Sequence, residues 1–160
     1  MKKIKLLLLL PVFLLSCVDN SSTFPDNADG VFYGRLTVGD YTQDNVGISV
    51  TVVSDSTVDV FFNDVKFAAL MPVKVDINVK GVPFTKYGDV LSFSAIEIDP
   101  YMNKEPEPQP EYRFATFRGV VKGNELVLEA KMSDDLESSS RAGKEFRFNG
   151  TCNWINRKTP

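Results

Sequence analysis

From Gly30 onward, hydrophobic and polar residues alternate with a period of two, and glycine, proline, asparagine and aspartate interrupt the alternation at short intervals. The clearest example is residues 73–80, VKVDINVK, whose odd-numbered positions are apolar and whose even-numbered positions are polar. Such an alternation turns one set of side chains toward a core and the other toward water, as in an antiparallel sheet. Because no stretch of three helical turns shows a helical period, the pattern predicts an all-β domain.

The pattern predicts about eight strands in hairpin order. They are residues 32–38, 48–52, 58–62, 73–80, 90–98, 112–121, 125–132 and 145–155. Turn residues such as Gly123-Asn124 separate neighbouring segments and favour antiparallel hairpins. Since eight antiparallel strands can close on themselves, we expect an up-and-down β-barrel, with a two-sheet β-sandwich as the alternative.

Large apolar side chains occupy the positions that would face the inside of this barrel. Those we expect to line it are Phe32, Leu36, Phe62, Phe93, Phe114, Phe146, Phe148 and Trp154. Two interpretations remain open: these side chains enclose a site for an apolar ligand, or they fill the barrel as a core. The apolar phase shifts between Phe114 and Phe117, which indicates either a β-bulge or a strand with aromatic rings on both faces.

The residues before the barrel have a different pattern. Three lysines precede a short apolar stretch that ends at Leu15, as in a secretory signal peptide. The segment Leu14-Leu15-Ser16-Cys17 resembles the bacterial lipobox, which implies that residues 1–16 are removed and that Cys17 carries lipid. Acyl chains at Cys17 would tether the protein to a bilayer without crossing it. The polar, turn-rich residues that follow favour a flexible tether over residues 17–29.

Composition and charge exclude several kinds of chemistry. The 160 residues include no histidine, so Ser-His-Asp and Cys-His nucleophile systems and histidine-ligated metals are excluded. Removal of residues 1–16 would take three of the 18 basic residues and none of the 21 acidic ones, which leaves a net charge of −6. A surface of this sign does not attract nucleic acid.

No segment predicts a catalytic site, a metal site or a cofactor site. The carboxylates of Asp134, Asp135 and Glu137 lie in a serine-rich stretch with no apolar wall, which favours a solvated loop over paired catalytic acids. No second segment brings further acids toward them. We therefore expect a protein that is not an enzyme.

The proline-rich segment 99–110, DPYMNKEPEPQP, is longer than a hairpin requires. Prolines at alternate positions favour an extended and partly stiff conformation. At one rim of a barrel, Tyr101 and Met102 could cover an opening or contact a partner. Recognition of sugars or peptides would use this rim and the outward-facing rings of Tyr33, Phe61 and Tyr112.

The barrel segment resembles the calycin-like (lipocalin-like) β-barrel domain of small exported lipoproteins of Gram-negative bacteria. The resemblance rests on the opening segment GVFYG at 30–34, on residues 58–63, on Met71-Pro72 before VKVDI, on Gly81-Val82-Pro83, and on Gly119 with ELVL at 125–128. The Gly-x-Trp signature of true lipocalins is absent, since Phe32 follows Gly30-Val31. The resemblance implies a barrel in the cell envelope, anchored at the outer membrane.

These observations predict a signal peptide over residues 1–16, a tether over 17–29, a calycin-like barrel over 30–155 and a tail over 156–160. The preferred hypothesis is that the barrel of a lipid-anchored envelope lipoprotein binds a small apolar or amphipathic ligand. The alternative is a module that contacts an envelope protein or a glycan, with a filled barrel and no internal ligand.

Overall fold

The computed structural model describes residues 30–137 and 141–152, so the signal peptide, Cys17, the tether and Trp154 lie outside the described residues. The described residues form nine strands and one turn of 3-10 helix. The strands are β1 (Val31–Val38), β2 (Tyr41–Val52), β3 (Thr57–Val65), β4 (Val75–Tyr87), β5 (Val90–Ile98), β6 (Tyr101–Met102), β7 (Phe114–Lys122), β8 (Glu125–Met132) and β9 (Glu145–Thr151), and the helical turn is η1 (Pro110–Tyr112). The prediction of an all-β domain is confirmed.

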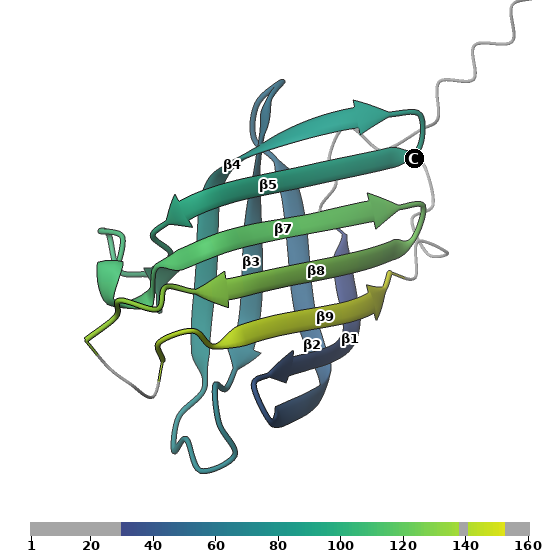
Figure 1. Ribbon diagram of the computed structural model, residues 1–160. Coiled ribbons are helices and arrows are strands. Elements are labelled where there is room, and N and C mark those ends of the chain that lie inside the picture. The colour runs from purple at the N-terminus through teal and green to yellow at the C-terminus, as the bar shows by residue number, and fades with distance from the viewer. Residues whose placement is uncertain (1–29, 138–140, 153–160) are drawn as a thin grey trace, which may run out of the picture.

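The strands form one closed antiparallel sheet. Their hydrogen-bonded order is β3-β2-β1-β9-β8-β7-β5-β4-β6, and an additional pairing of β3 with β4 closes the barrel. Apart from β6, the eight wall strands follow one another around the barrel in chain order, as predicted for an up-and-down barrel. In Figure 1, β5, β7, β8 and β9 cross in front of β1, β2 and β3 at a steep angle. A barrel, rather than the alternative sandwich, is therefore the observed architecture, and it is compatible with a calycin-like fold.

Strand β4 bends around the barrel at Gly81. Val79 and Val82 are both buried, and the register with β3 shifts between Val58 and Val60, so an extra residue forms a bulge here. Gly81 takes a φ of 68°, which other residues rarely adopt, and its N–H donates to Asp59 Oδ1 at 2.8 Å. The bend takes β4 from β3 to β5, which pair with its first and second halves respectively.

Strand β6 covers the place where β4 and β5 separate. Strand β5 pairs only with Phe84–Tyr87 of β4, and the earlier part of β4 pairs with β6 instead, with Ile77 opposite Met102. The Met102 side chain is buried. Part of the proline-rich rim segment is thus built into the barrel wall, as a short strand that the periodicity did not predict.

Apolar side chains fill the inside of the barrel. The Phe117 ring lies 6.2 Å from that of Phe62, 6.1 Å from that of Phe93 and 5.5 Å from that of Phe114, measured between centroids. Phe114 also meets Phe146 edge to face at 5.4 Å. Phe114 and Phe117 both turn inward because the β7–β8 register shifts between Phe114 and Thr116, so the bulge is the alternative that forms.

The two ends of the barrel differ in their connections. Short turns join β2 to β3, β4 to β5 and β7 to β8 at the end where β1 begins, whereas the opposite end has the long connections over residues 66–74 and 99–113, the connection from β8 to β9 and the short β1–β2 turn. The Phe67 ring packs on those of Tyr112 and Phe146, and Lys144 Nζ donates to the Phe67 carbonyl at 3.1 Å. Val73 lies in the first of these connections and is 60% exposed, so its predicted inward position is wrong.

Candidate functional site

The predicted interior residues are brought together, but as a packed core. Seven of them lie within the described residues and are at most 2% exposed: Phe32, Leu36, Phe62, Phe93, Phe114, Phe146 and Phe148. They belong to one contiguous apolar cluster. Cys152, which directly follows β9, is also buried. Side chains in such a cluster contact one another, so protein atoms occupy the inside of the barrel.

Of the two rim residues, Tyr101 borders a small hollow of about 250 Å³ on the outside of β3, β4 and β6, whereas Met102 is buried in the core. Phe61, one of the predicted outward-facing aromatic residues, also lines it. The Lys80 ammonium lies 3.8 Å from the Tyr101 ring centroid and so occupies a face of that ring. A planar ligand would have to displace Lys80 to stack there, which argues against this hollow as the principal site.

The rest of the rim segment is held firmly. Arg113 Nε and Nη2 donate to the two carboxylate oxygens of Asp99 at 2.6 and 3.0 Å, which ties the start of the segment to the residue just before β7, and Gln109 N–H donates to the Pro100 carbonyl at 2.8 Å. The hydrogen bond to Asp99, together with the negative charge of Asp99, raises the pKa of Arg113 above its usual value. Of the other predicted aromatic residues, Tyr33 is exposed and Tyr112 is half-buried.

The acidic cluster does not form a site. Asp134, Asp135 and Glu137 are exposed, and Asp134 is paired with Lys131 at 2.7 Å. Within residues 30–137 and 141–152, no group of three or more cysteine, aspartate or glutamate side chains is arranged to hold a metal ion.

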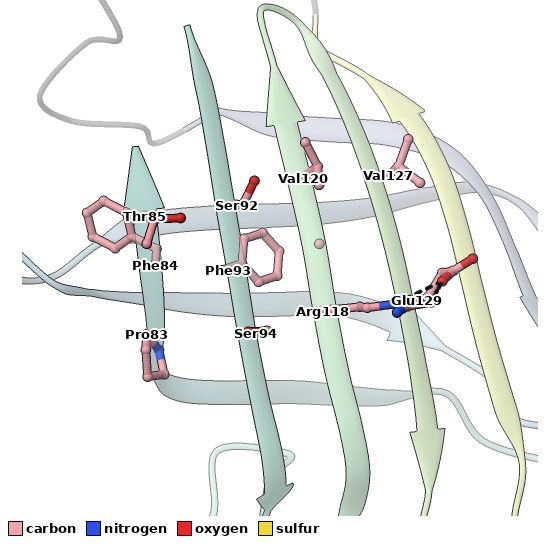
Figure 2. A pocket seen from close by; sticks show the side chains of 11 residues that line it. Pro83, Phe84, Thr85, Ser92, Phe93, Ser94, Arg118, Val120, Val127 and Glu129 are labelled. Carbon is pink, nitrogen blue, oxygen red and sulfur yellow. Dashed lines mark hydrogen bonds and ion pairs between the residues drawn. The ribbon is translucent and has the colours of Figure 1, made fainter. Parts of the chain in front are cut away.

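A larger hollow, of about 390 Å³, lies on the outer face of β4, β5, β7 and β8 (Figure 2). Its lining comes from four adjacent strands: Pro83, Phe84, Thr85, Ser92, Phe93, Ser94, Arg118, Gly119, Val120, Val127 and Glu129. Its volume is within the range of about 300–1,000 Å³ that is usual for small-molecule sites. We refer to it as the outer groove.

Two rows of side chains border the outer groove. The hydroxyl–valine row runs across the strands as Thr85, Ser92, Val120 and Val127, and the charged row runs parallel to it as Ser94, Arg118 and Glu129. Arg147 on β9 continues the charged row beyond the outer groove. The rows are two residues apart along each strand, which is about 7 Å. The residues between them, including Phe93 and Gly119, turn inward.

The outer groove is hollow because small side chains line its middle. Ser92 and Ser94 project outward from β5 between the larger residues of β4 and β7. Beneath them, the Phe93 ring lies over Gly119, where a Cβ would come within 2.2 Å of Phe93 Cζ. The aromatic ring takes the space that a larger residue at position 119 would need, so the wall below the groove is closed.

The polar groups of the outer groove are incompletely paired. Arg118 Nε and Nη2 both donate to the same oxygen of Glu129, Oε2, the former at 3.1 Å, and this pair crosses from β7 to β8 in Figure 2. Among the described residues, Arg118 Nη1 and Glu129 Oε1 have no partner, and neither do the hydroxyls of Thr85, Ser92 and Ser94. These groups are therefore free to bind a ligand in place of water.

A second hollow, of about 510 Å³, adjoins the outer groove on the far side of the charged row. It shares Ser94, Arg118 and Glu129 with the outer groove and continues past Thr116 toward β9. A ligand longer than the outer groove could extend over the charged row into this second hollow.

The chain significantly matches no protein-family model, no curated protein and no solved structure. The described residues include no helix of the length and apolarity needed to cross a membrane. The calycin-like family thus remains a resemblance.

Sequence reasoning missed the outer groove because it looked for outward-facing aromatic rings, Tyr33, Phe61 and Tyr112, none of which lines the groove. A signal was present in the apolar outward residues of two adjacent segments, Val120 in GVVK and Val127 in LVLE. They remain 41% and 46% exposed in the barrel. Two such residues directly opposite each other on a solvent face indicate a binding surface better than either alone.

Proposed function

We propose that the protein is a non-enzymatic binding module of the bacterial cell envelope, anchored by lipid on Cys17. Its barrel serves as a packed scaffold, and its outer surface binds a glycan or an envelope protein. One observation supports this proposal above all: the inside of the barrel is filled by aromatic and aliphatic side chains, whereas the outer groove is open and has unpaired polar groups.

An internal apolar ligand, the hypothesis preferred from the sequence, has less support. Opening a cavity in a packed core costs roughly 24 cal/mol per Å³, and ligand sites begin at about 300 Å³, so the cost is about 7 kcal/mol. This is comparable to the whole stability of a small domain, about 5–15 kcal/mol. A ligand in the outer groove requires no such rearrangement.

The lipid anchor is proposed from the lipobox-like segment that ends at Cys17. Strand β1 begins at the end of the barrel that has the short turns, opposite the long connections. Twelve residues separate Cys17 from Gly30, and a chain of this length spans at most ~40 Å. This reach allows the sides of the barrel to face the aqueous compartment next to the membrane.

Two experiments test this function. Growth with radiolabelled palmitate should label the wild-type protein and leave a Cys17→Ala variant unlabelled; labelling of both would contradict the anchor. Native mass spectrometry of the full-length protein from its own host should give the mass of the acylated chain without an apolar adduct. A stoichiometric small molecule that is released only on unfolding would show that the inside of the barrel is the site.

A further inference from the structure

We propose that the outer groove is a saccharide site and that it selects an uncharged sugar with adjacent hydroxyls. This inference rests on the proposed function and gives it a ligand class and a set of contact residues. Three properties of the groove support a saccharide ligand: its unpaired polar groups, its apolar wall and its balance of charge.

The Arg118–Glu129 pair leaves both charged donors and a charged acceptor without a protein partner. Because Nε and Nη2 of Arg118 both bind Glu129 Oε2, Nη1 of Arg118 and Oε1 of Glu129 are available for a ligand. A sugar hydroxyl both donates and accepts, so one hydroxyl of a vicinal pair can accept from Nη1 while the next donates to Oε1. Both hydrogen bonds involve a charged partner, which makes them stronger than bonds between neutral groups.

The hydroxyl–valine row, at the opposite border of the groove, can contact both the C–H face and the edge hydroxyls of a sugar ring. Val120 and Val127 provide a partly exposed apolar surface for the C–H face of a pyranose. The free hydroxyls of Thr85 and Ser92 lie in the same row and can bind hydroxyls at the edge of the ring. A ligand that is apolar on its faces and rich in hydroxyls at its edge fits both kinds of contact.

The charge of the groove favours an uncharged ligand. Arg118 and Glu129 are the two charged residues of its lining and compensate each other. An acidic sugar would meet the Glu129 carboxylate, and repulsion of like charges would weaken its binding. A plain alkyl chain would displace water from Nη1, Oε1 and the hydroxyls without replacing the hydrogen bonds, and each group left unpaired costs roughly tenfold in affinity.

The groove needs little rearrangement to bind. Its residues lie on four hydrogen-bonded strands, and the packing of the Phe93 ring over Gly119 holds β5 against β7. A site built on strands keeps its geometry better than one built on loops, which reduces the entropy lost on binding.

The test uses the full-length lipidated protein in vesicles of uncharged lipid, with short neutral gluco-, galacto- and manno-oligosaccharides as probes and oligogalacturonates as the acidic comparison. Ligand-observed NMR and isothermal titration calorimetry measure binding. We expect at least one neutral series to bind and the acidic series to bind more weakly. Glu129→Gln should weaken that binding about tenfold through loss of a charged acceptor, and Ser92→Leu should abolish it by filling the groove.

The matched control is Asp44→Asn. Asp44 accepts from Arg35 Nε at 2.8 Å in another exposed pair between neighbouring strands, away from the outer groove. This variant should bind like the wild type, and circular dichroism should show that all three variants are folded.

Three results would overturn the inference. Failure of every neutral probe to bind, equal binding by Ser92→Leu and wild type, or preference for the acidic series would each exclude a neutral saccharide in this groove. None of these results affects the proposed binding module, because capture of an envelope protein by the outer face would remain consistent with it. An apolar adduct inside the barrel would instead overturn the proposed function itself.

Discussion

The two faces of strands β5, β7 and β8 differ sharply although the same short segments form both. On the inner face, Phe93, Phe117 and Leu128 are at most 2% exposed and belong to one apolar cluster. On the outer face, one residue further along two of these strands, Ser94 and Arg118 line a groove and have polar groups without protein partners. Because side chains alternate across a strand, a packed core and an open site can be one residue apart.

This contrast teaches where a small barrel can bind a ligand. A barrel of eight strands is just wide enough for side chains to fill its inside, and six phenylalanine rings are among the largest side chains that do so here. A ligand of such a filled barrel would bind on the outside, where a hollow forms only if small residues interrupt the side-chain rows. Ser92 and Ser94 provide that interruption.

The largest expected effect on stability comes from a cavity in the core on the inner face. Phe117→Ala would remove a ring that is fully buried among Phe62, Phe93 and Phe114. We expect a loss of about 3–5 kcal/mol in the free energy of unfolding, measured by urea denaturation, because transfer and cavity terms add.

The control for this variant is Val120→Ala on the outer face of the same strand. Val120 is 41% exposed, so its truncation should change the free energy of unfolding by about 0.5 kcal/mol or less. Similar small losses for Phe117→Ala and Val120→Ala would mean that the barrel is loosely packed, and an internal ligand would then become the better hypothesis.

A second test concerns the contact of Phe93 with Gly119, which closes the barrel wall below the outer groove. Gly119→Val would place a Cβ 2.2 Å from Phe93 Cζ and force the ring to move. We expect a destabilisation of about 1–3 kcal/mol, typical of overpacking. Adding Phe93→Leu, which makes room at the same point, should recover part of the lost free energy of unfolding. Purely additive effects of the two substitutions would show that Phe93 does not fill the space over Gly119.

The sequence predicts the inside of this protein better than the outside. Alternation identified the wall strands, because burial of apolar residues fixes which face each residue takes. The phase shift between Phe114 and Phe117 left a bulge and a two-sided strand as alternatives, and only the structure shows that the bulge forms. Strand β6 was missed because Tyr101 and Met102 are too few residues to show a period. Val73 continues the apolar alternation of residues 73–80, but β4 starts only at Val75.

The outer groove could not be predicted for a different reason. It depends on which outward residues become cross-strand neighbours. The Gly123-Asn124 turn sets the pairs Val120–Val127 and Arg118–Glu129, whereas the pairs of β5 with β7, such as Ser94 with Arg118, lie across a long connection and no turn signal fixes them. Periodicity within one strand gives the face of a residue but not its neighbours on the next strand. The free Nη1 of Arg118 and Oε1 of Glu129 are further details of side-chain geometry that no pattern of residue types contains.

A third test compares the energetics of the outer face with those of the inner face. Arg118 and Glu129 are exposed by 71% and 47% of their side-chain areas, so water screens their attraction. Glu129→Gln should lower the free energy of unfolding by about 0–1 kcal/mol, and added salt should reduce the difference. A salt-independent loss as large as that of Phe117→Ala would show that this pair is structural, contrary to its proposed role in binding.

The smallest expected effect is the pH dependence of the Asp99–Arg113 ion pair at the rim of the barrel. The hydrogen bond and charge of Asp99 raise the pKa of Arg113, so the stabilisation by this pair is fully present below the usual pKa of arginine and is lost only as pH rises through the higher folded-state value. Arginine ordinarily keeps its proton up to about pH 12. The difference in urea midpoint between wild type and Asp99→Asn should therefore be the same at about pH 7 and about pH 10, and a difference that shrinks by the higher pH would mean that Asp99 depends on a lysine instead. Asp44→Asn, which removes the partner of Arg35, should show the same independence of pH, since Asp44 raises the pKa of Arg35 in the same way.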